Sequence, residues 1–143
     1  MLASLADLVR TFHLYWRWVV VLLLVLATAY GLYGWLAKRA WDSLSAWLRR
    51  ATPIAFDIQV TLGLLLYVLE KYWTKGGTDP FRAYVHPLLM LVALGLLHMF
   101  LARGRPTEPD AARYRWMALG AATALLLAWA GGALPVRMFP PAV

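Results

Sequence analysis

The chain of 143 residues contains no cysteine. This absence excludes disulfide bonds, thiolate-bound metals and iron–sulfur clusters, and it excludes haem attached covalently through a C-x-x-C-H motif. Asparagine is also absent, and Gln59 is the only glutamine. Any redox group in this protein must therefore be held non-covalently, by ligands other than cysteine.

Charged residues are scarce as well. Only 15% of the residues are charged and 62% are hydrophobic, whereas soluble domains have about 25% charged and 45–50% apolar residues. The net charge of +7 does not indicate a nucleic-acid partner, because the Lys and Arg residues flank apolar runs, where they meet anionic lipid headgroups. No glycine-rich nucleotide loop, zinc signature or nucleophile triad is present. The composition favours an integral membrane protein without soluble-type enzyme chemistry.

Four apolar stretches are each near the ~20 residues that cross a hydrocarbon core about 30 Å thick. Lipid tolerates no open sheet edge, so these runs must be helices, and short connections make consecutive helices antiparallel. The sequence therefore predicts an all-α, up-down-up-down four-helix bundle, a single membrane domain over residues 1–143. Two amphipathic segments, about residues 2–12 and 41–48, are expected at the membrane interface. The expected spans are 12–36, 53–73, 84–101 and 116–133.

The distribution of Lys and Arg predicts the orientation, because short loops that are rich in cations stay in the cytoplasm. The first and third connections hold eight such residues: Lys38, Arg39, Arg49, Arg50, Arg103, Arg105, Arg113 and Arg115. The two ends and the second connection hold six: Arg10, Arg17, Lys71, Lys75, Arg82 and Arg137. We therefore expect a multi-pass protein of the inner (cytoplasmic) membrane, with both termini on the non-cytoplasmic side.

Two of the three histidines open helices that run in the same direction. His13 begins the first helix and His86 the third, so their imidazoles are expected at the same depth near the outer surface. Neutral imidazole is a natural ligand for haem iron where no thiolate is available. The pattern predicts that His13 and His86 bind the iron of one haem b. The alternative is two interfacial histidines that bind water or backbone.

Arg17 supports the haem interpretation, since it follows His13 by four residues and shares its helix face. Its guanidinium is expected to pair with a haem propionate or with Glu70. A snorkelling interfacial arginine is the alternative.

A second group of polar residues lies toward the opposite end of the spans. Asp57 and Gln59 fall one to two turns into the second helix, and His98 is one turn from the end of the third. A carboxylate inside a span is costly unless it is paired or functional. The sequence thus predicts a quinone or proton site at Asp57 and His98, with Gln59 orienting a carbonyl. The alternative is a structural pair of Asp57 with Arg50 or His98.

Three segments of this sequence resemble a family of small four-span bacterial membrane proteins described as cytochrome b or cytochrome b-like, and the likeness covers nearly the whole chain. The resemblance implies that His13 and His86 are the iron ligands and that the polar framework includes Arg17, Gln59 and His98. The segments are HLYWRW (His13–Trp18), DIQVTLGLLLY (Asp57–Tyr67) and HPLLMLVALGLLH (His86–His98).

The leading functional hypothesis is therefore a membrane-bound electron carrier with one bis-histidine haem b, which passes electrons between quinol and a redox partner subunit. The main alternative is a cofactor-free accessory or assembly subunit of a larger membrane complex. A small transporter that uses Asp57 and His98 is a third hypothesis, but the broken-helix pattern of such proteins is missing. Because four helices cover a cofactor poorly, a homo-oligomer is also expected.

Overall fold

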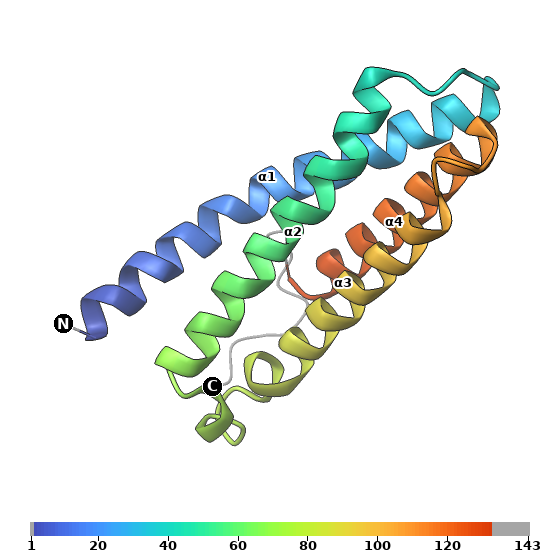
Figure 1. Cartoon of the computed structure of the whole chain (residues 1–143). Helices are drawn as coiled ribbons and strands as arrows, with labels where there is room; N and C mark the ends of the chain where they lie inside the picture. The colour runs from blue at the N-terminus through green and yellow to red at the C-terminus, as the bar shows by residue number, and fades with distance from the viewer. Residues whose placement is uncertain (1, 133–143) are drawn as a thin grey trace.

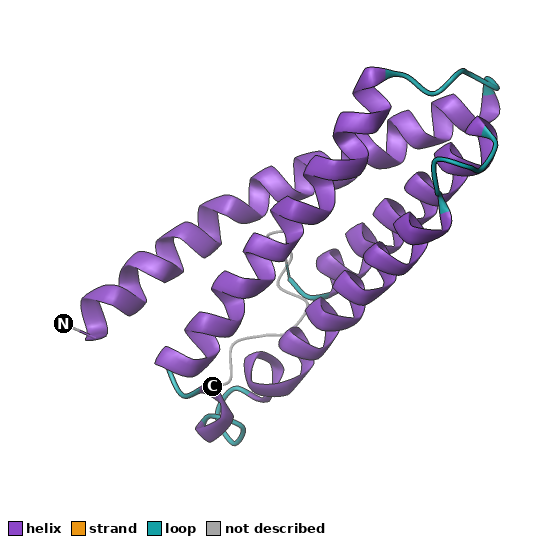
Figure 2. Ribbon diagram, in the orientation of Figure 1, coloured by secondary structure: helices purple, strands orange, loops and turns teal. Residues whose placement is uncertain are grey.

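The computed structural model describes residues 2–132, and all regular structure in that range is helical (Figure 2). Two short turns, η1 (Tyr72–Thr74) and η2 (Phe81–Val85), lie in the second connection. The predicted all-α four-helix bundle is confirmed (Figure 1). Its helices are α1 (Leu2–Leu36), α2 (Ser43–Leu69), α3 (His86–Arg103) and α4 (Asp110–Ala130).

The four helices do not pack equally against one another. The helix α4 lies against both α1 and α3, and α1 also packs along α2. By contrast, α2 has far less contact with α3 and hardly touches α4. The bundle is thus tight around α4, and the loosest packing between adjacent helices is that of α2 with α3. Its largest fully buried side chains are Tyr114, Phe56, Leu24, Leu48, Leu97, Met117, Thr52 and Ser45.

Three of the four helices, α1, α2 and α4, begin earlier than the expected spans. The first helix starts at Leu2 and the second at Ser43, so the two amphipathic segments are the opening turns of α1 and α2 rather than separate elements. Asp42 explains the start of α2, because its carboxylate accepts a 2.8 Å hydrogen bond from the backbone N–H of Ser45 and satisfies one of the free donors of the first turn.

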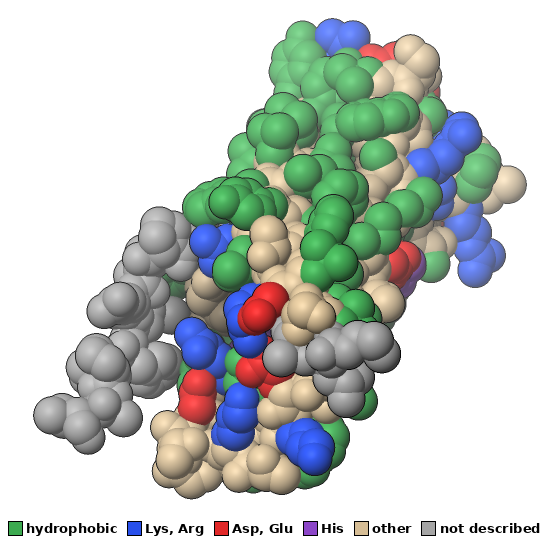
Figure 3. Space-filling view, turned by 90° about the vertical axis from the view of Figure 1, so that its left-hand side faces the viewer, with side chains coloured by type: hydrophobic (Ala, Val, Ile, Leu, Met, Phe, Trp, Pro, Cys, Tyr) green, Lys and Arg blue, Asp and Glu red, His purple; other side chains and the backbone are tan. Residues whose placement is uncertain are grey.

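Three helical segments are long and apolar enough to cross a membrane: Ser4–Leu36, Ser43–Leu69 and Phe81–Arg103. They indicate a multi-pass helical membrane protein. The fourth expected span, 116–133, falls in α4, which is not among the helices that are long and apolar enough to cross a membrane. Residue 133 lies outside the described residues. Arg113 and Arg115 and the many alanines make α4 less hydrophobic than its neighbours. Hydrophobic side chains cover much of the face in Figure 3, with charged groups gathered toward its lower end and others at its top and right-hand edge.

Two glycines bring α1 and α4 into unusually close contact. A Cβ atom at Gly31 would lie 2.9 Å from the backbone nitrogen of Ala118, and one at Gly34 would collide with the ring of Tyr114. Small residues are favoured at helix interfaces in membranes because they let backbones approach and gain van der Waals contact. The α1–α4 interface therefore depends on the missing side chains of Gly31 and Gly34.

A polar network fixes the end of the bundle where α1 turns into α2. Ser45 Oγ lies 2.6 Å from Asp42 Oδ1 and 2.7 Å from the buried hydroxyl of Tyr114 on α4. The hydroxyl of Tyr30 donates to Asp42 Oδ2 at 2.6 Å. Hydrogen bonds from Ser45 and Tyr30 hold the pKa of the Asp42 carboxyl at about 2, below its usual range. This network ties three helices together at one point.

Gly31→Ala is expected to destabilise the bundle by about 1–3 kcal/mol, because the new methyl group meets backbone that cannot rotate away. The measurement is the free energy of unfolding in mixed detergent micelles. Gly95→Ala is the matched control, since a Cβ at Gly95 in α3 meets nothing within 4 Å. Equal stability of the two variants would show that α1 and α4 are not in close contact.

Candidate functional site

His13 and His86 face each other between α1 and α3. Their ring centroids are 6.4 Å apart and the ring planes are inclined by 80°. Both side chains are partly buried. The expected facing of these two histidines at one depth is therefore confirmed, although they come from helices that are not direct neighbours in the bundle.

The helix α2 positions His13. The side-chain amide nitrogen of Gln59 lies 3.3 Å from His13 Nε2 and donates a 3.1 Å hydrogen bond to the His13 carbonyl oxygen. One turn further along α2, a Cβ at Gly63 would lie only 3.0 Å from His13 Cε1. The imidazole therefore rests on the bare backbone of Gly63 and is oriented by Gln59.

A widened helical turn and the end of α4 position His86. The π-helical turn η2 ends directly before His86, whose backbone N–H bonds to the carbonyl of Phe81, five residues back. Pro87 accounts for the widening, because it has no N–H to give and its ring would clash with the carbonyl four residues earlier. His86 Nδ1 lies 2.7 Å from the carbonyl oxygen of Gly131, the C-cap of α4. Since a carbonyl can only accept, Nδ1 carries the proton and Nε2 is left with its lone pair.

The pair has the spacing of two ligands on one metal. Metal–nitrogen bonds to histidine are about 2 Å long and the nitrogen is about 1 Å from the ring centre, so two imidazoles on opposite sides of a metal have centroids about 6 Å apart. The observed 6.4 Å agrees. Ligating histidines also use their other nitrogen for a hydrogen bond that fixes the ring. The contact of His86 with Gly131 has this form, and Gln59 contacts one nitrogen of His13.

Buried polar atoms without partners gather around His13. Six buried side-chain atoms within residues 2–132 lack a hydrogen-bond partner, and three of them are His13 Nδ1, Arg17 Nε and Gln59 Oε1. Because buried polar groups in folded proteins are nearly always satisfied, such a group of orphans marks a place where a ligand or water is required. Two imidazoles, a guanidinium and an amide form a donor set that fits an anionic haem.

Arg17 has no ion pair among residues 2–132, and its guanidinium lies 5.0 Å from the ring of Trp18. The expected alternative pairing with Glu70 is wrong. Glu70 instead pairs with Arg10 and, at 3.1 Å, with Lys75. The reason is position: Glu70 caps the end of α2, level with the first turns of α1, and Arg17 lies almost two turns deeper. Arg17 is left free to bind an anion beside His13.

Asp57 and His98 form a second site on the surface between α2 and α3. His98 Nε2 lies 2.9 Å from Asp57 Oδ1, and the two side chains are 50% and 46% exposed. Gln59 does not belong to this site, contrary to the sequence-based expectation. Residues two apart on a helix point in nearly opposite directions, so Asp57 faces outward and Gln59 faces His13. Arg50 does not pair with Asp57.

Sequence reasoning missed the contributions of Gly63 and Gly131. Gly131 acts through a backbone carbonyl, which no side-chain pattern reveals, and α4 carries no ionisable group beside it. The sequence gives only a weak indication for Gly63: it lies four residues after Gln59 and therefore on the same helix face. Neither residue could be linked to a histidine without the helix packing.

Within residues 2–132 no group of three or more His, Cys, Asp or Glu side chains is placed to hold a metal ion. The metal-ligating candidate is thus the two-imidazole pair. Comparison of the chain with protein-family models, with curated proteins and with solved structures finds no match.

Proposed function

We propose that this protein is a membrane-bound electron carrier that holds one haem b between His13 and His86. The observation that carries the proposal is the facing pair of imidazoles at 6.4 Å, surrounded by buried polar atoms without partners. The resemblance of the segments around both histidines to cytochrome b-like proteins points to the same two residues. When bound, the haem supplies one-electron redox chemistry.

The residues of the chain have separate roles in this proposal. His13 and His86 hold the iron, and the Gly131 carbonyl keeps the proton of His86 on Nδ1. Arg17 neutralises a propionate, and its burial makes that charge-assisted contact stronger than it would be in water. The sparse packing between the adjacent helices α2 and α3 means that a flat group beside them displaces little existing contact.

Asp57 and His98 are proposed to bind quinol and accept its protons. A quinol loses two electrons and two protons on oxidation, so a one-electron carrier takes them in two successive steps, with one proton leaving at each step. The imidazole and the carboxylate, already in contact at 2.9 Å, offer an acceptor for a quinol hydroxyl proton. Their exposure on the flank of the bundle lets a quinol reach them from the lipid.

The proposed membrane orientation places both termini on the non-cytoplasmic side, as the distribution of Lys and Arg favours. The helix α4 lies along α1 and α3. This packing supports the proposal that α4 shares their depth in the bilayer and acts as a fourth span. Asp57 then lies near the middle of the bilayer and His98 toward the cytoplasmic end of α3, and His13 and His86 lie in the non-cytoplasmic half.

Orientation is tested by thiol labelling, because the natural chain has no cysteine to give a background. Gly77→Cys in the second connection is expected to react with a membrane-impermeant maleimide on intact cells, since this position has open space around it. Thr107→Cys in the third connection is expected to react only after the membrane is opened. The reverse pattern would contradict the proposed orientation.

The haem is tested by the visible spectrum of the detergent-purified protein, oxidised and then reduced with dithionite, with a pyridine haemochrome assay for stoichiometry. We expect about one haem b per chain with a sharp reduced α-band. His13→Ala and His86→Ala are each expected to abolish the low-spin spectrum, because each variant keeps only one of the two imidazoles that would hold the iron.

His98→Ala is the matched control for these variants, since it removes the third histidine away from the facing pair, and it should keep the spectrum. An unchanged spectrum in His13→Ala would overturn the ligand assignment. A wild-type protein that stays colourless after haem is added would contradict the haem proposal and favour the accessory-subunit alternative.

The quinol site is tested by the rate at which decyl-ubiquinol reduces the haem. Asp57→Asn is expected to slow this reduction about a hundredfold, the usual contribution of a positioned proton acceptor, while the dithionite-reduced spectrum stays unchanged. Asp57→Glu should restore part of the rate. Asp7→Asn, which removes an exposed carboxylate from the first turns of α1, is the control. A normal rate in Asp57→Asn would exclude the proposed role.

A further inference from the structure

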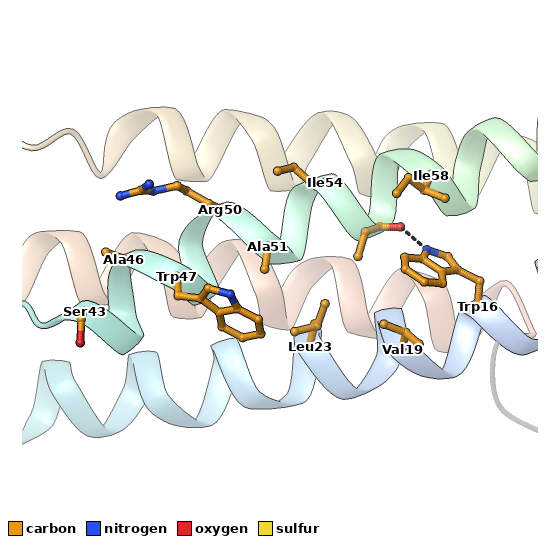
Figure 4. Close-up of a pocket in the computed structure, with 11 residues that line it drawn as sticks. Trp16, Val19, Leu23, Ser43, Ala46, Trp47, Arg50, Ala51, Ile54 and Ile58 are labelled. Atoms are coloured by element: carbon orange, nitrogen blue, oxygen red, sulfur yellow. Dashed lines mark hydrogen bonds between the residues drawn. The ribbon is translucent and has the colours of Figure 1, made fainter.

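A groove of about 670 Å³ runs along the outer surface between α1 and α2, apart from both proposed redox sites (Figure 4). Its walls are almost entirely apolar, and its volume lies within the usual range of ligand sites, about 300–1,000 Å³. The lining residues are Trp16, Val19, Leu23, Ser43, Ala46, Trp47, Arg50, Ala51, Ile54, Ala55 and Ile58.

The groove is polar at one end only. Arg50 extends from α2 toward the end where Ser43 lies (Figure 4), and both side chains are exposed. The opposite end is closed by Trp16, whose indole N–H donates a 2.9 Å hydrogen bond to the Ala55 carbonyl oxygen and so joins α1 to α2. The groove thus has a cationic mouth and an apolar interior.

Arg50 has no carboxylate partner within residues 2–132, and no acidic side chain lines the groove. Its neighbour Arg49 instead donates to the Leu101 carbonyl at 2.9 Å. The uncompensated charge at the mouth of the groove therefore calls for an anion from outside the chain.

The length and direction of the groove fit a lipid. From Arg50 to Ile58 the helix rises by about 12 Å, close to the depth of one leaflet of hydrocarbon, which is about 15 Å. The groove follows a candidate span, so an acyl chain in it keeps the direction that it has in the bilayer. The phosphate of that lipid would then lie at the level of Arg50.

We propose that this groove binds one anionic phospholipid, with its phosphate on Arg50 and one acyl chain packed between Trp47 and Trp16. The residues Ala46, Ala51 and Ala55 give the chain room, because larger side chains at these positions would fill the groove. An anionic headgroup is selected over a zwitterionic one by the single unpaired guanidinium.

The test is native mass spectrometry of the full chain released from nanodiscs that contain equal amounts of phosphatidylglycerol and phosphatidylcholine with identical acyl chains. Wild type is expected to retain one phosphatidylglycerol in preference to phosphatidylcholine. Arg50→Gln should lower that preference about fivefold, the usual effect of one basic residue at an anionic surface, and Arg50→Lys should keep most of it.

Two further variants distinguish the contribution of the lipid headgroup to binding from that of the acyl chain. Ala51→Phe fills the groove and should reduce retention of both lipids. Arg105→Gln removes an arginine of the third connection and should change nothing. The proposal is overturned if wild type shows no preference between the lipids, if Arg50→Gln keeps the full preference, or if Ala51→Phe retains lipid as well as wild type.

Discussion

The contact of α1 with α4 holds the rest of the arrangement in place. Gly31 and Gly34 let α1 lie directly on Ala118 and Tyr114 of α4. The same helix packs on α3, and its C-cap, Gly131, offers a carbonyl to His86. Although α4 contributes no side chain to the facing pair, it therefore sets the distance between the two histidines. Their facing geometry is a property of the packing of α4 more than of α1 and α3 themselves.

Polar groups inside the spans divide into two kinds. Around His13 the polar atoms are buried and several lack partners, which is costly in a medium without water. Asp57 and His98 are paired with each other, but both side chains are half exposed on the flank of candidate spans, where an ionisable pair is costly unless it has a function. A fold that keeps unsatisfied groups in its interior has a use for that interior. A fold that keeps an exposed pair on its flank has a use for exchange with its surroundings.

The fold class could be predicted from hydrophobicity alone, because in lipid a long apolar run can form all its backbone hydrogen bonds only as a helix. The common depth of His13 and His86 could also be predicted, since they lie on helices of the same direction, whereas their facing depends on the helix packing. The first two helices begin about ten residues before the expected spans, because hydropathy does not detect the Asp42 cap or the continuity of an amphipathic first turn. The grouping of Gln59 with Asp57 failed for a reason that the sequence did contain: a spacing of two places side chains on opposite faces.

The turn η2 has a consequence for how this chain can change over time. In this turn the backbone N–H of His86 bonds to a carbonyl five residues back, whereas in an α-helix the carbonyl is four residues back. The segment before His86 is therefore offset by one residue, or about 100° of rotation, relative to a continuous α-helix. A turn that already absorbs one extra residue can gain or lose one by shifting between π and α geometry. Insertions and deletions in the connection from α2 can therefore accumulate upstream of Phe81 while the imidazole of His86 keeps its direction toward His13 and Gly131.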